Sequence, residues 1–436
     1  MVSALDSEIT GSTYADPDIA ACFSDEAEIQ AYLAFEIALA KSQENLGIIP
    51  HGCAAVIADA LDGATIDYRN LERGFRNDGI IVPELIAVLR SQLPADVANY
   101  LHFGVTSQDV IDTALTLRMK RVIELITRKN ERLCAQLKTL IQDHRYTLTI
   151  ARTRNQNAAP TVFGLKVINW LRPLQRRQDA IRSMMPNLLK LQLGGAVGTM
   201  AALGTQAEEL NSMLAEELRL QAAESPWHVQ RDEMVGFSDW LSTTAGTVGK
   251  MGQDMLLLSQ SEIAELRFKQ GGKSSTLPNK SNPVLPEFLI TLAKYTQFLS
   301  NTFKSTLVTS NERDGISIML ENLTLPSLAC AAGASISLAS NAIDLLEVDC
   351  DAMARNIERD GGRFLAEAMS FQLRSIMSKA KASRLVGEAC SASLRNGTHM
   401  IDELSSAVEA DFDWNSLKNP LNALGEAQKI IDRSLG

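Results

Sequence analysis

Apolar residues recur at every third or fourth position over most of this 436-residue chain. That spacing places them on one face of an α-helix. The segment from Ser24 to Gly47 shows the pattern with a serine and acidic residues at its start and a glycine at its end, so it predicts a helix. Residues 1–23 have few periodic apolar positions and predict an irregular arm. Residues 50–100 predict shorter helices, with breaks around Pro50, Gly63, Gly79 and Pro94.

The longest periodic stretch without proline or glycine runs from Val110 to His144. A helix of this length spans roughly 50 Å at 1.5 Å per residue, and its first turn is a well-placed ligand site. Four further long helices are predicted over residues 161–192, 229–268, 284–306 and 324–347. Strand-like alternation is absent, so the pattern predicts an all-α bundle of long helices and no sheet.

The chain is too long for a single hydrophobic core and predicts three helical domains. The predicted N-terminal domain covers residues 1–108, and the central long-helix bundle covers 109–350. Breaks near Gly361 and Gly397 indicate shorter helices in a C-terminal domain over 351–436.

Composition narrows the class of protein. With 45% apolar residues, 22% charged residues and a net charge of −10, the chain resembles an ordinary soluble protein, and its charge argues against nucleic acid or an anionic membrane as the main partner. No apolar run approaches the ~20 residues that span a bilayer. The six cysteines lack metal-ligand spacing and predict free thiols in a reducing cytoplasm.

Three polar breaks lie at the ends of long predicted helices, at residues 102–109, 151–157 and 271–283. Helix N-termini present free N–H groups and a partial positive charge, which suit carboxylate oxygens. The breaks also contain hydroxyl and amide side chains. We therefore expect a small polycarboxylate to bind there.

The break at 271–283 predicts a mobile polar loop between two rigid helices, which is a suitable ligand clamp. Ser274 follows two glycines and has Lys280 nearby in the sequence. If the loop closes over substrate, desolvation and cationic donors can turn this hydroxyl into a general base. A helix-capping role is the alternative for Ser274, as it is for Thr106 and Ser107.

Two further side chains in the polar breaks have two interpretations each. His102 flanks the first break and either faces the ligand or is structural. We expect the other four histidines to have surface or structural roles. Arg154 is either a solvated charge or a clamp for a second carboxylate. Five scattered histidines do not indicate a metal site.

The three breaks resemble the conserved blocks of the fumarase/aspartase superfamily. The loop contains SSTLPNKSNP, the first block HFGVTSQDVIDTAL and the second RTRNQNAAPTVFG, in the order and spacing of that superfamily. Further resemblance runs from SDEAEIQAYLAFEIALA through PWHVQRDEMVGFSDWL to NPLNALGEAQKIIDR, and so covers nearly the whole chain. Overall the chain is most similar to bacterial 3-carboxy-cis,cis-muconate cycloisomerases and then to adenylosuccinate lyases.

The resemblance implies an all-helical protomer of three domains in a homotetramer with a twenty-helix core. It implies active sites built from three subunits and chemistry that needs no metal or organic cofactor. Ser274 would be the catalytic base, with Lys280 and Asn282 stabilising an aci-carboxylate intermediate. The expected substrate-binding residues are His102, Thr106, Ser107, Gln108, Thr153, Arg154, Gln156, Asn157, Ser275, Thr276, Glu287, Asn77 and Arg313.

The chain departs from the family pattern at several of these positions. In the loop, Lys273 replaces a glycine, Asn279 a histidine and Ser281 an arginine. Asn157 replaces the general-acid histidine of adenylosuccinate lyases, and Asn77 replaces the histidine of their R-H-D motif. The usual histidine acids are therefore missing.

Arg154 stands where fumarases and aspartases carry a histidine, and Glu287 matches the glutamate that pairs with it. These two residues either form a salt bridge, or Arg154 binds an extra carboxylate of the substrate.

Poor leaving groups need an acid that is missing here, which weakens the adenylosuccinate interpretation. An amine that leaves as its protonated form needs less help, and so does lactone formation. We expect elimination of an amine from an N-substituted aspartate with further carboxylates, giving fumarate. The alternatives are lactonisation of 3-carboxymuconate, which overall similarity favours, and an inactive helical scaffold.

Overall fold

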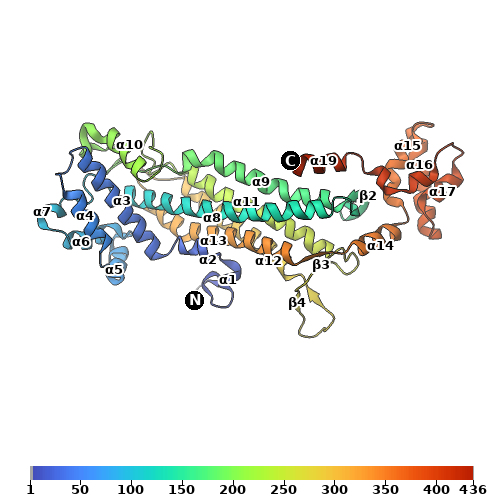
Figure 1. The fold of residues 1–436 in the computed structure, drawn as a ribbon, viewed down its shortest axis with the longest axis horizontal. Coiled ribbons are helices and arrows are strands. Elements are labelled where there is room, and N and C mark those ends of the chain that lie inside the picture. Colours follow the sequence, from blue (N-terminus) through green and yellow to red (C-terminus); the bar gives the residue numbers. More distant parts are fainter. Residues whose placement is uncertain (1–2, 436) are drawn as a thin grey trace. The chain divides into compact units, whose positions relative to one another are not determined.

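The computed structural model describes residues 3–435, and its longest elements are helices (Figure 1). All five predicted long helices are present: α8 (Ser107–Asp143), α9 (Phe163–Leu188), α11 (Asp232–Leu258), α12 (Val284–Phe303) and α13 (Gly315–Leu345). The predicted all-α class is therefore confirmed.

Shorter helices precede and follow the long ones. The predicted helix after Ser24 is α3 (Asp25–Asn45), and the Ser24 side chain accepts from the Ala27 backbone N–H as its cap. The next four are α4 (Cys53–Asp62), α5 (Tyr68–Asp78), α6 (Val82–Ser91) and α7 (Ala95–Ala98). Between α9 and α11 lies α10 (Ala207–Glu217). The C-terminal part contains α14 (Cys350–Asp360), α15 (Ala366–Leu373), α16 (Lys379–Asn396), α17 (Met400–Ala407), α18 (Trp414–Lys418) and α19 (Ala427–Leu435).

The chain divides into two compact units. Unit 1 comprises Met1–Asn130, Arg176–Gly246 and Thr291–Ser337, and unit 2 comprises Glu131–Gln175, Thr247–Ile290 and Leu338–Gly436. The division cuts each of the five long helices. The division into three domains stays a prediction.

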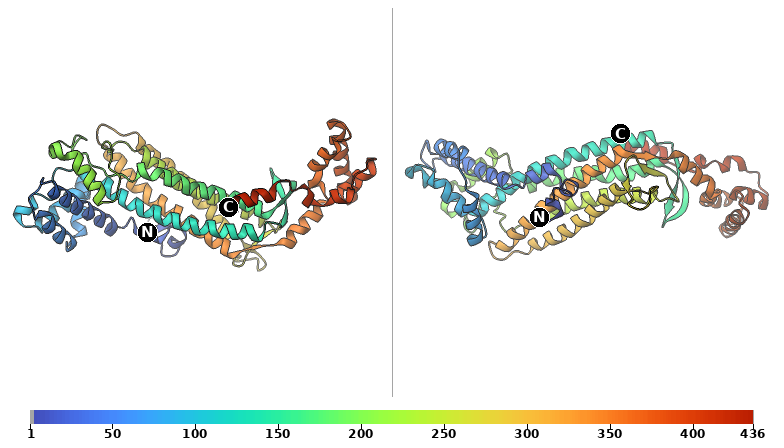
Figure 2. Two further views of the ribbon diagram at one scale, coloured as in Figure 1. Left: turned by 45° about the horizontal axis from the view of Figure 1, so that its top comes forward. Right: turned by 90° about the horizontal axis from the view of Figure 1, so that it is seen from below.

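Each unit has its own apolar core. In unit 1, residues of α3, α4 and α6 pack with the start of α8 and with α10, around side chains such as Phe35, Leu85 and Leu210. In unit 2, a core formed mainly by α15, α16 and α17 includes Leu373, Val386 and Ile150. The helix α19 returns to the end of α8 (Figure 2), where Arg145 Nη2 donates to Asp432 Oδ1 at 2.6 Å.

The expectation of no strands is wrong at three places, all in unit 2. β1 (Leu148–Thr153) pairs antiparallel with β2 (Gln156–Val162), β3 (Leu266–Phe268) with β6 (Leu346–Val348), and β4 (Gly272–Lys273) with β5 (Ser281–Asn282). The register of the first pair shifts between Ala151 and Arg152, and the other strands have two or three residues each. Such short or bulged strands give no clear period of two.

Several boundaries also differ from the prediction, and α13, expected from residue 324, begins at Gly315. The N-terminal segment is less irregular than expected, because it contains α1 (Gly11–Tyr14) and α2 (Pro17–Ala21), with Ile19 and Asp16 buried. The helix predicted to run to residue 268 ends at Leu258, before β3.

Among the described residues, α13 alone is long and apolar enough to cross a membrane by length and composition. Its 18-residue apolar window is 72% buried inside the protein. A core helix of a folded protein passes the same test.

Candidate active site

The first polar break forms the N-terminus of α8. Thr106 precedes the first helical residue, and its backbone N–H donates to Asp109 Oδ2 at 3.0 Å, which is half of a capping box. The fully buried Asp109 also accepts from the backbone N–H groups of Gly194 (2.9 Å) and Gly195 (3.0 Å) and lies 2.9 Å from His228 Nε2. Asp109 therefore holds the segment that contains Gly194 and Gly195 against the start of α8.

Arg313 contacts the turn at the start of α8. Its Nη2 donates to Thr106 Oγ1 and, at 3.4 Å, to the Gly195 carbonyl oxygen. The contact brings together two predicted substrate-binding residues that are 207 positions apart in the sequence. A guanidinium beside a hydroxyl and a helix N-terminus is a suitable arrangement for a carboxylate.

Gln108 and Ser107 lie in the same turn but in different surroundings. Gln108 is buried, and its Nε2 donates to Asp112 Oδ2 at 3.1 Å and to the His228 carbonyl oxygen at 2.9 Å. Ser107 is half-buried. The amide nitrogen of Gln108 is thus engaged within the protein.

The turn before α8 is held from α3. His102 has a left-handed backbone (φ 58°), and its Nδ1 lies 2.6 Å from Oε1 of the buried Glu36. About two helical turns further along α3, Gln43 Nε2 donates to the Phe103 carbonyl oxygen at 2.7 Å. These bonds fix the backbone that leads into Thr106.

A cluster of buried charges lies next to this turn; we call Asp112, Arg231 and Glu321 the buried charge cluster. Arg231 Nη1 donates to Asp112 Oδ1 at 3.1 Å, and its Nε donates to Glu321 Oε1 at 2.8 Å. All three side chains are at most 3% exposed. The cluster therefore ties the segment before α11 to α8 and α13.

The pKa values in the buried charge cluster reflect its burial. Loss of water raises the pKa of Asp112 and of Glu321, and Arg231 offsets only part of that rise. Burial by itself would lower the pKa of Arg231, but the two carboxylates raise it above its usual value.

The second polar break is the tip of the β1–β2 hairpin in unit 2. Thr153 pairs with Gln156 across a turn in which Arg154 (φ 50°) and Asn155 (φ 64°) are left-handed, as in a type I′ turn. Thr153, Arg154 and Gln156 are exposed. The hairpin thus presents their side chains to solvent.

The base of this hairpin is anchored by buried polar contacts. Arg152 donates to both oxygens of the fully buried Glu265, at 2.6 and 3.1 Å, and Thr149 Oγ1 donates to the same carboxylate at 3.1 Å. Asn157 Nδ2 donates to Asp360 Oδ2 of α14 at 3.0 Å. The exposed tip therefore rests on a fixed base.

The third polar break, residues 271–283, forms an exposed loop closed by the β4–β5 pair; we call it the signature loop. Gly272 pairs with Asn282, and Lys273 pairs with Ser281. A Cβ on Gly272 would lie 2.4 Å from Val284 Cγ2. A side chain at this position would therefore require Val284 or the loop backbone to shift.

Ser274 lies directly after β4 and caps a local turn. Its Oγ accepts from the backbone N–H of Thr276 at 3.3 Å and of Leu277 at 3.0 Å. Ser275 Oγ lies 3.4 Å from Thr276 Oγ1, and Lys280 is exposed. The hydroxyl oxygen of Ser274 thus has two backbone donors of its own loop.

Two further predicted residues lie on helices. Asn77 is exposed near the end of α5, and Glu287 is exposed in the first turn of α12. Within the described part of unit 2, the structure records no hydrogen bond between the signature loop and the β1–β2 hairpin. The fold thus brings Thr106 to Arg313 within unit 1, and Thr153 to Gln156 within unit 2.

Sequence reasoning missed the buried residues that support these groups: Glu36, Asp112, Arg231, Glu265, Glu321 and Asp360. One signal could have found Asp112, because a charged residue within the apolar run VIDTAL must be buried and paired. Its charged partner, Arg231, is 119 residues away, which no local pattern indicates.

The chain is similar to known enzymes over most of its length. The model of the Lyase family matches residues 12–296. A 3-carboxy-cis,cis-muconate cycloisomerase of Pseudomonas aeruginosa is 34% identical over 95% of this chain and 93% of its own length. A nitrosuccinate lyase of Streptomyces davaonensis is 30% identical over 100% of this chain and 96% of its own.

The structure is also similar to solved ones. The crystal structure of a fumarate lyase from Mesorhizobium sp. BNC1 superposes with a TM-score of 0.90 at 27% identity, covering 97% of this chain and 98% of that one.

Proposed function

The chain belongs to the Lyase family of the fumarase/aspartase superfamily, and on that premise we propose that it is a carbon–nitrogen lyase. Its substrate is an N-substituted aspartate with further carboxylates. Ser274 removes a proton from the carbon α to one carboxylate, a C=C bond forms, and the C–N bond breaks. The products are fumarate and an amine, which keeps the electron pair of the broken bond.

The observation that carries the proposal is the hydrogen bonding of Ser274. Two backbone N–H groups, of Thr276 and Leu277, donate to its Oγ. Donors directed at an oxygen favour its ionised form and so lower the barrier to its use as a base. The loop supplies these donors before substrate arrives.

Lys280 and Asn282 follow Ser274 within the same loop and take the role of stabilising the intermediate. Proton loss leaves two negative charges on the adjacent carboxylate, and a lysine ammonium and an amide N–H can bind them. Asn282 is already positioned by its pairing with Gly272. The pair Thr106 and Arg313 binds another carboxylate of the substrate.

Three asparagines support an amine as the leaving group. Asn77, Asn157 and Asn279 carry no titratable proton, and Asn157 is bound to Asp360. These positions cannot protonate a leaving group. An amine that is already protonated in the substrate complex needs less assistance, which favours C–N cleavage.

A second candidate is reversible lactonisation of 3-carboxymuconate. It is supported by the 34% identity to the Pseudomonas aeruginosa cycloisomerase. In that reaction Ser274 would handle a proton α to a carboxylate in the same way, and a carboxylate oxygen would take the place of the amine. The name of the Streptomyces relative, a nitrosuccinate lyase, supports the first candidate instead, because its substrate is a succinate with a nitrogen substituent.

We also propose that copies of this chain complete one another's sites in a homotetramer. The first block lies at the start of α8, whose 37 residues make a helix of roughly 55 Å, and the second block follows its other end. Phe298 of α12 and Ile316 and Leu323 of α13 are 66 to 76% exposed in the single chain. Apolar side chains in such numbers favour association, which light scattering after gel filtration would measure.

The cytoplasm is the proposed compartment. All six cysteines are free thiols, and four of them are buried. A reducing environment suits thiols without partners.

Parallel assays test the reaction. In one assay the purified protein is incubated with a panel of N-substituted aspartates, and fumarate is followed by its ultraviolet absorbance. In a second assay the protein is incubated with 3-carboxymuconate. Fumarate release that disappears in Ser274→Ala supports the proposal. Turnover of carboxymuconate alone would replace it with lactonisation, and turnover of neither would favour the inactive scaffold.

A further inference from the structure

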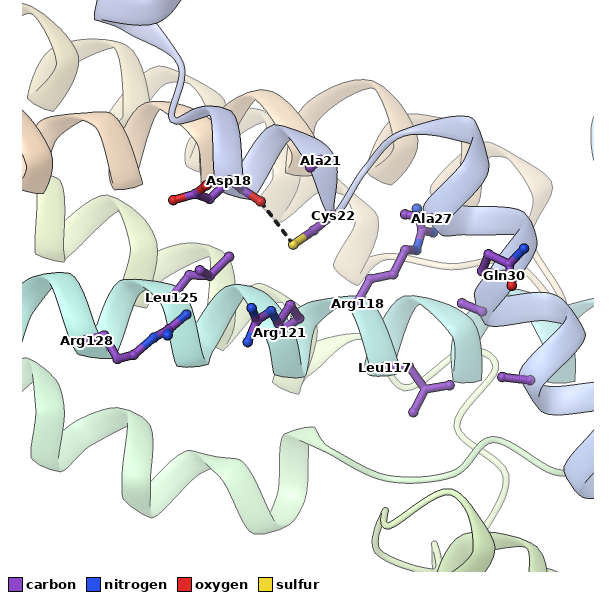
Figure 3. A pocket seen from close by; sticks show the side chains of 12 residues that line it. Asp18, Ala21, Cys22, Ala27, Gln30, Leu117, Arg118, Arg121, Leu125 and Arg128 are labelled. Carbon is purple, nitrogen blue, oxygen red and sulfur yellow. Dashed lines mark hydrogen bonds between the residues drawn. The ribbon is translucent and has the colours of Figure 1, made fainter.

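A pocket in unit 1 lies outside the residues assigned to the reaction. It has a volume of about 700 Å³ and lies between α8 and the N-terminal segment with α2 and α3 (Figure 3). Pockets of this size hold small organic molecules. None of the predicted site residues lines it.

Three arginines of α8 line one wall of the pocket. Arg118, Arg121 and Arg128 are three and seven positions apart, a spacing that keeps them on one face of the helix. Figure 3 shows them along α8, with Cys22 and Asp18 on the opposite side. With these three arginines and one aspartate, the pocket lining carries a net charge of +2 in a protein whose net charge is −10.

Arg118 carries an unused donor. Its side chain is only 9% exposed and its Nη2 donates to Glu28 at 3.3 Å, yet its Nε has no hydrogen-bond partner. A buried N–H without a partner costs about 1–3 kcal/mol. The Nε atom is closed to solvent, so a ligand oxygen would remove that cost when the Arg118 side chain turns toward the pocket.

The other two guanidinium groups are also available. Arg121 pairs with Glu124 at 3.0 Å in an exposed i,i+3 contact, which is weak. For Arg128, no hydrogen bond or ion pair is recorded among residues 3–435. Both side chains can therefore turn toward an anion without breaking a strong bond.

The remaining lining is largely apolar, with alanines of α3 and the leucines Leu117 and Leu125 of α8. We propose that this pocket binds a small organic anion that carries at least two carboxylate or phosphate groups on an apolar body. The guanidinium groups bind the charged ends in bidentate fashion, and the alanine and leucine side chains contact the body. The proposal does not depend on the proposed reaction.

The pocket is separate from the first block along α8. Arg118 follows Ser107 by 11 residues, and Arg128 follows it by 21, which corresponds to about 16 and 31 Å along the helix. Binding at the two places can therefore be abolished by different substitutions.

Isothermal titration calorimetry tests the proposal with two probes, benzene-1,2,4-tricarboxylate for the carboxylate class and 1,4-phenylene bisphosphate for the phosphate class. We expect one of them to bind once per chain, and R121Q/R128Q to weaken that binding at least tenfold. Both arginines are exposed, so the variant should fold. The matched control R132Q removes an exposed arginine of the same helix outside the pocket and should leave binding unchanged.

The variant T106A/R313Q separates this site from the candidate active site and should retain the binding event. The proposal is overturned if that event is lost in T106A/R313Q and kept in R121Q/R128Q, or if neither probe binds the wild-type protein. It is also overturned if R121Q/R128Q lowers the molecular mass in light scattering, because this face would then be an interface between copies.

Discussion

The buried charge cluster and the signature loop are both rich in polar groups, yet the chain treats them in opposite ways. In the cluster, Arg231 contacts Asp112 and Glu321, and all three are almost fully buried. In the loop, Lys273 and Lys280 are exposed, and the Ser274 hydroxyl bonds only to its own loop backbone.

The two regions differ in whether their polar groups bond within the protein or remain available to a ligand. A buried charge must be paired, because desolvation costs several kcal/mol per ion, so the cluster fixes helices and leaves little capacity for a ligand. An exposed loop loses little by leaving its donors unpaired. Its ammonium and amide groups therefore remain free to bind a substrate.

The comparison predicts that substitutions in the loop change activity and leave stability alone. Ser274→Ala should lower kcat by about 10²–10⁴-fold, the usual contribution of a positioned general base. The midpoint of urea unfolding should stay within error of the wild type. The exposed Ser375→Ala, far outside the loop in sequence, is the matched control for both measurements. Full activity in Ser274→Ala would refute the base assignment.

The opposite result is expected in the buried charge cluster. Arg231→Met leaves two buried carboxylates unpaired and should lower the free energy of unfolding by about 3–5 kcal/mol. Arg384→Met breaks an exposed i,i+4 pair with Glu388 and should change it by less than about 0.5 kcal/mol.

Should Arg231→Met fail to fold, the triple variant with Asp112→Asn and Glu321→Gln provides the measurement. Removing the charges of both partners should restore soluble protein. Equal loss of stability in the single and triple variants would contradict the pairing argument.

A smaller effect is expected where the loop depends on its backbone. In Gly272→Ala the new Cβ would meet Val284 Cγ2 at 2.4 Å and displace the β4–β5 pair. We expect kcat/KM to fall about tenfold, since a misplacement of about 1 Å can cost up to 10²-fold. Gly387→Ala in α16 meets nothing within 4 Å and should leave activity unchanged. Equal activity of both variants would show that the pairing of the strands is not needed.

The smallest effect is a pH dependence of stability in unit 2. His399 caps α17 by accepting from the Ile401 N–H, and burial, helped by Lys418, lowers its pKa below 6.5. Below about pH 6.5 the His399 imidazole takes up a proton in the unfolded chain, but in the folded chain it stays neutral to a lower pH. The free energy of unfolding therefore falls as pH drops through this range.

His399→Asn retains a cap acceptor without a titrating group. Urea midpoints between pH 7.5 and 5.5 should therefore fall less in the variant than in the wild type. Burial also lowers the pKa of His144, so part of the dependence will remain. Parallel curves for the two proteins would contradict the assignment.

The long helices could be predicted because their apolar period extends over many turns, as in α8 and α13. The β1–β2 hairpin could not, since Thr149 and Ile150 are adjacent and both buried, which breaks the alternation of a strand. The positions of the polar breaks were visible as interruptions of helical spacing. Which groups meet, such as Arg313 with Thr106, depends on tertiary packing across 207 residues.

The exposure of the signature loop also makes it a reporter. Lys273 and Lys280 are each followed by serine, so trypsin can cut the loop at either bond while the helices around it stay folded. A ligand that closes the loop would slow this cleavage. The rate of nicking can therefore rank candidate polycarboxylates before any reaction is known, with intact mass spectrometry as the detector.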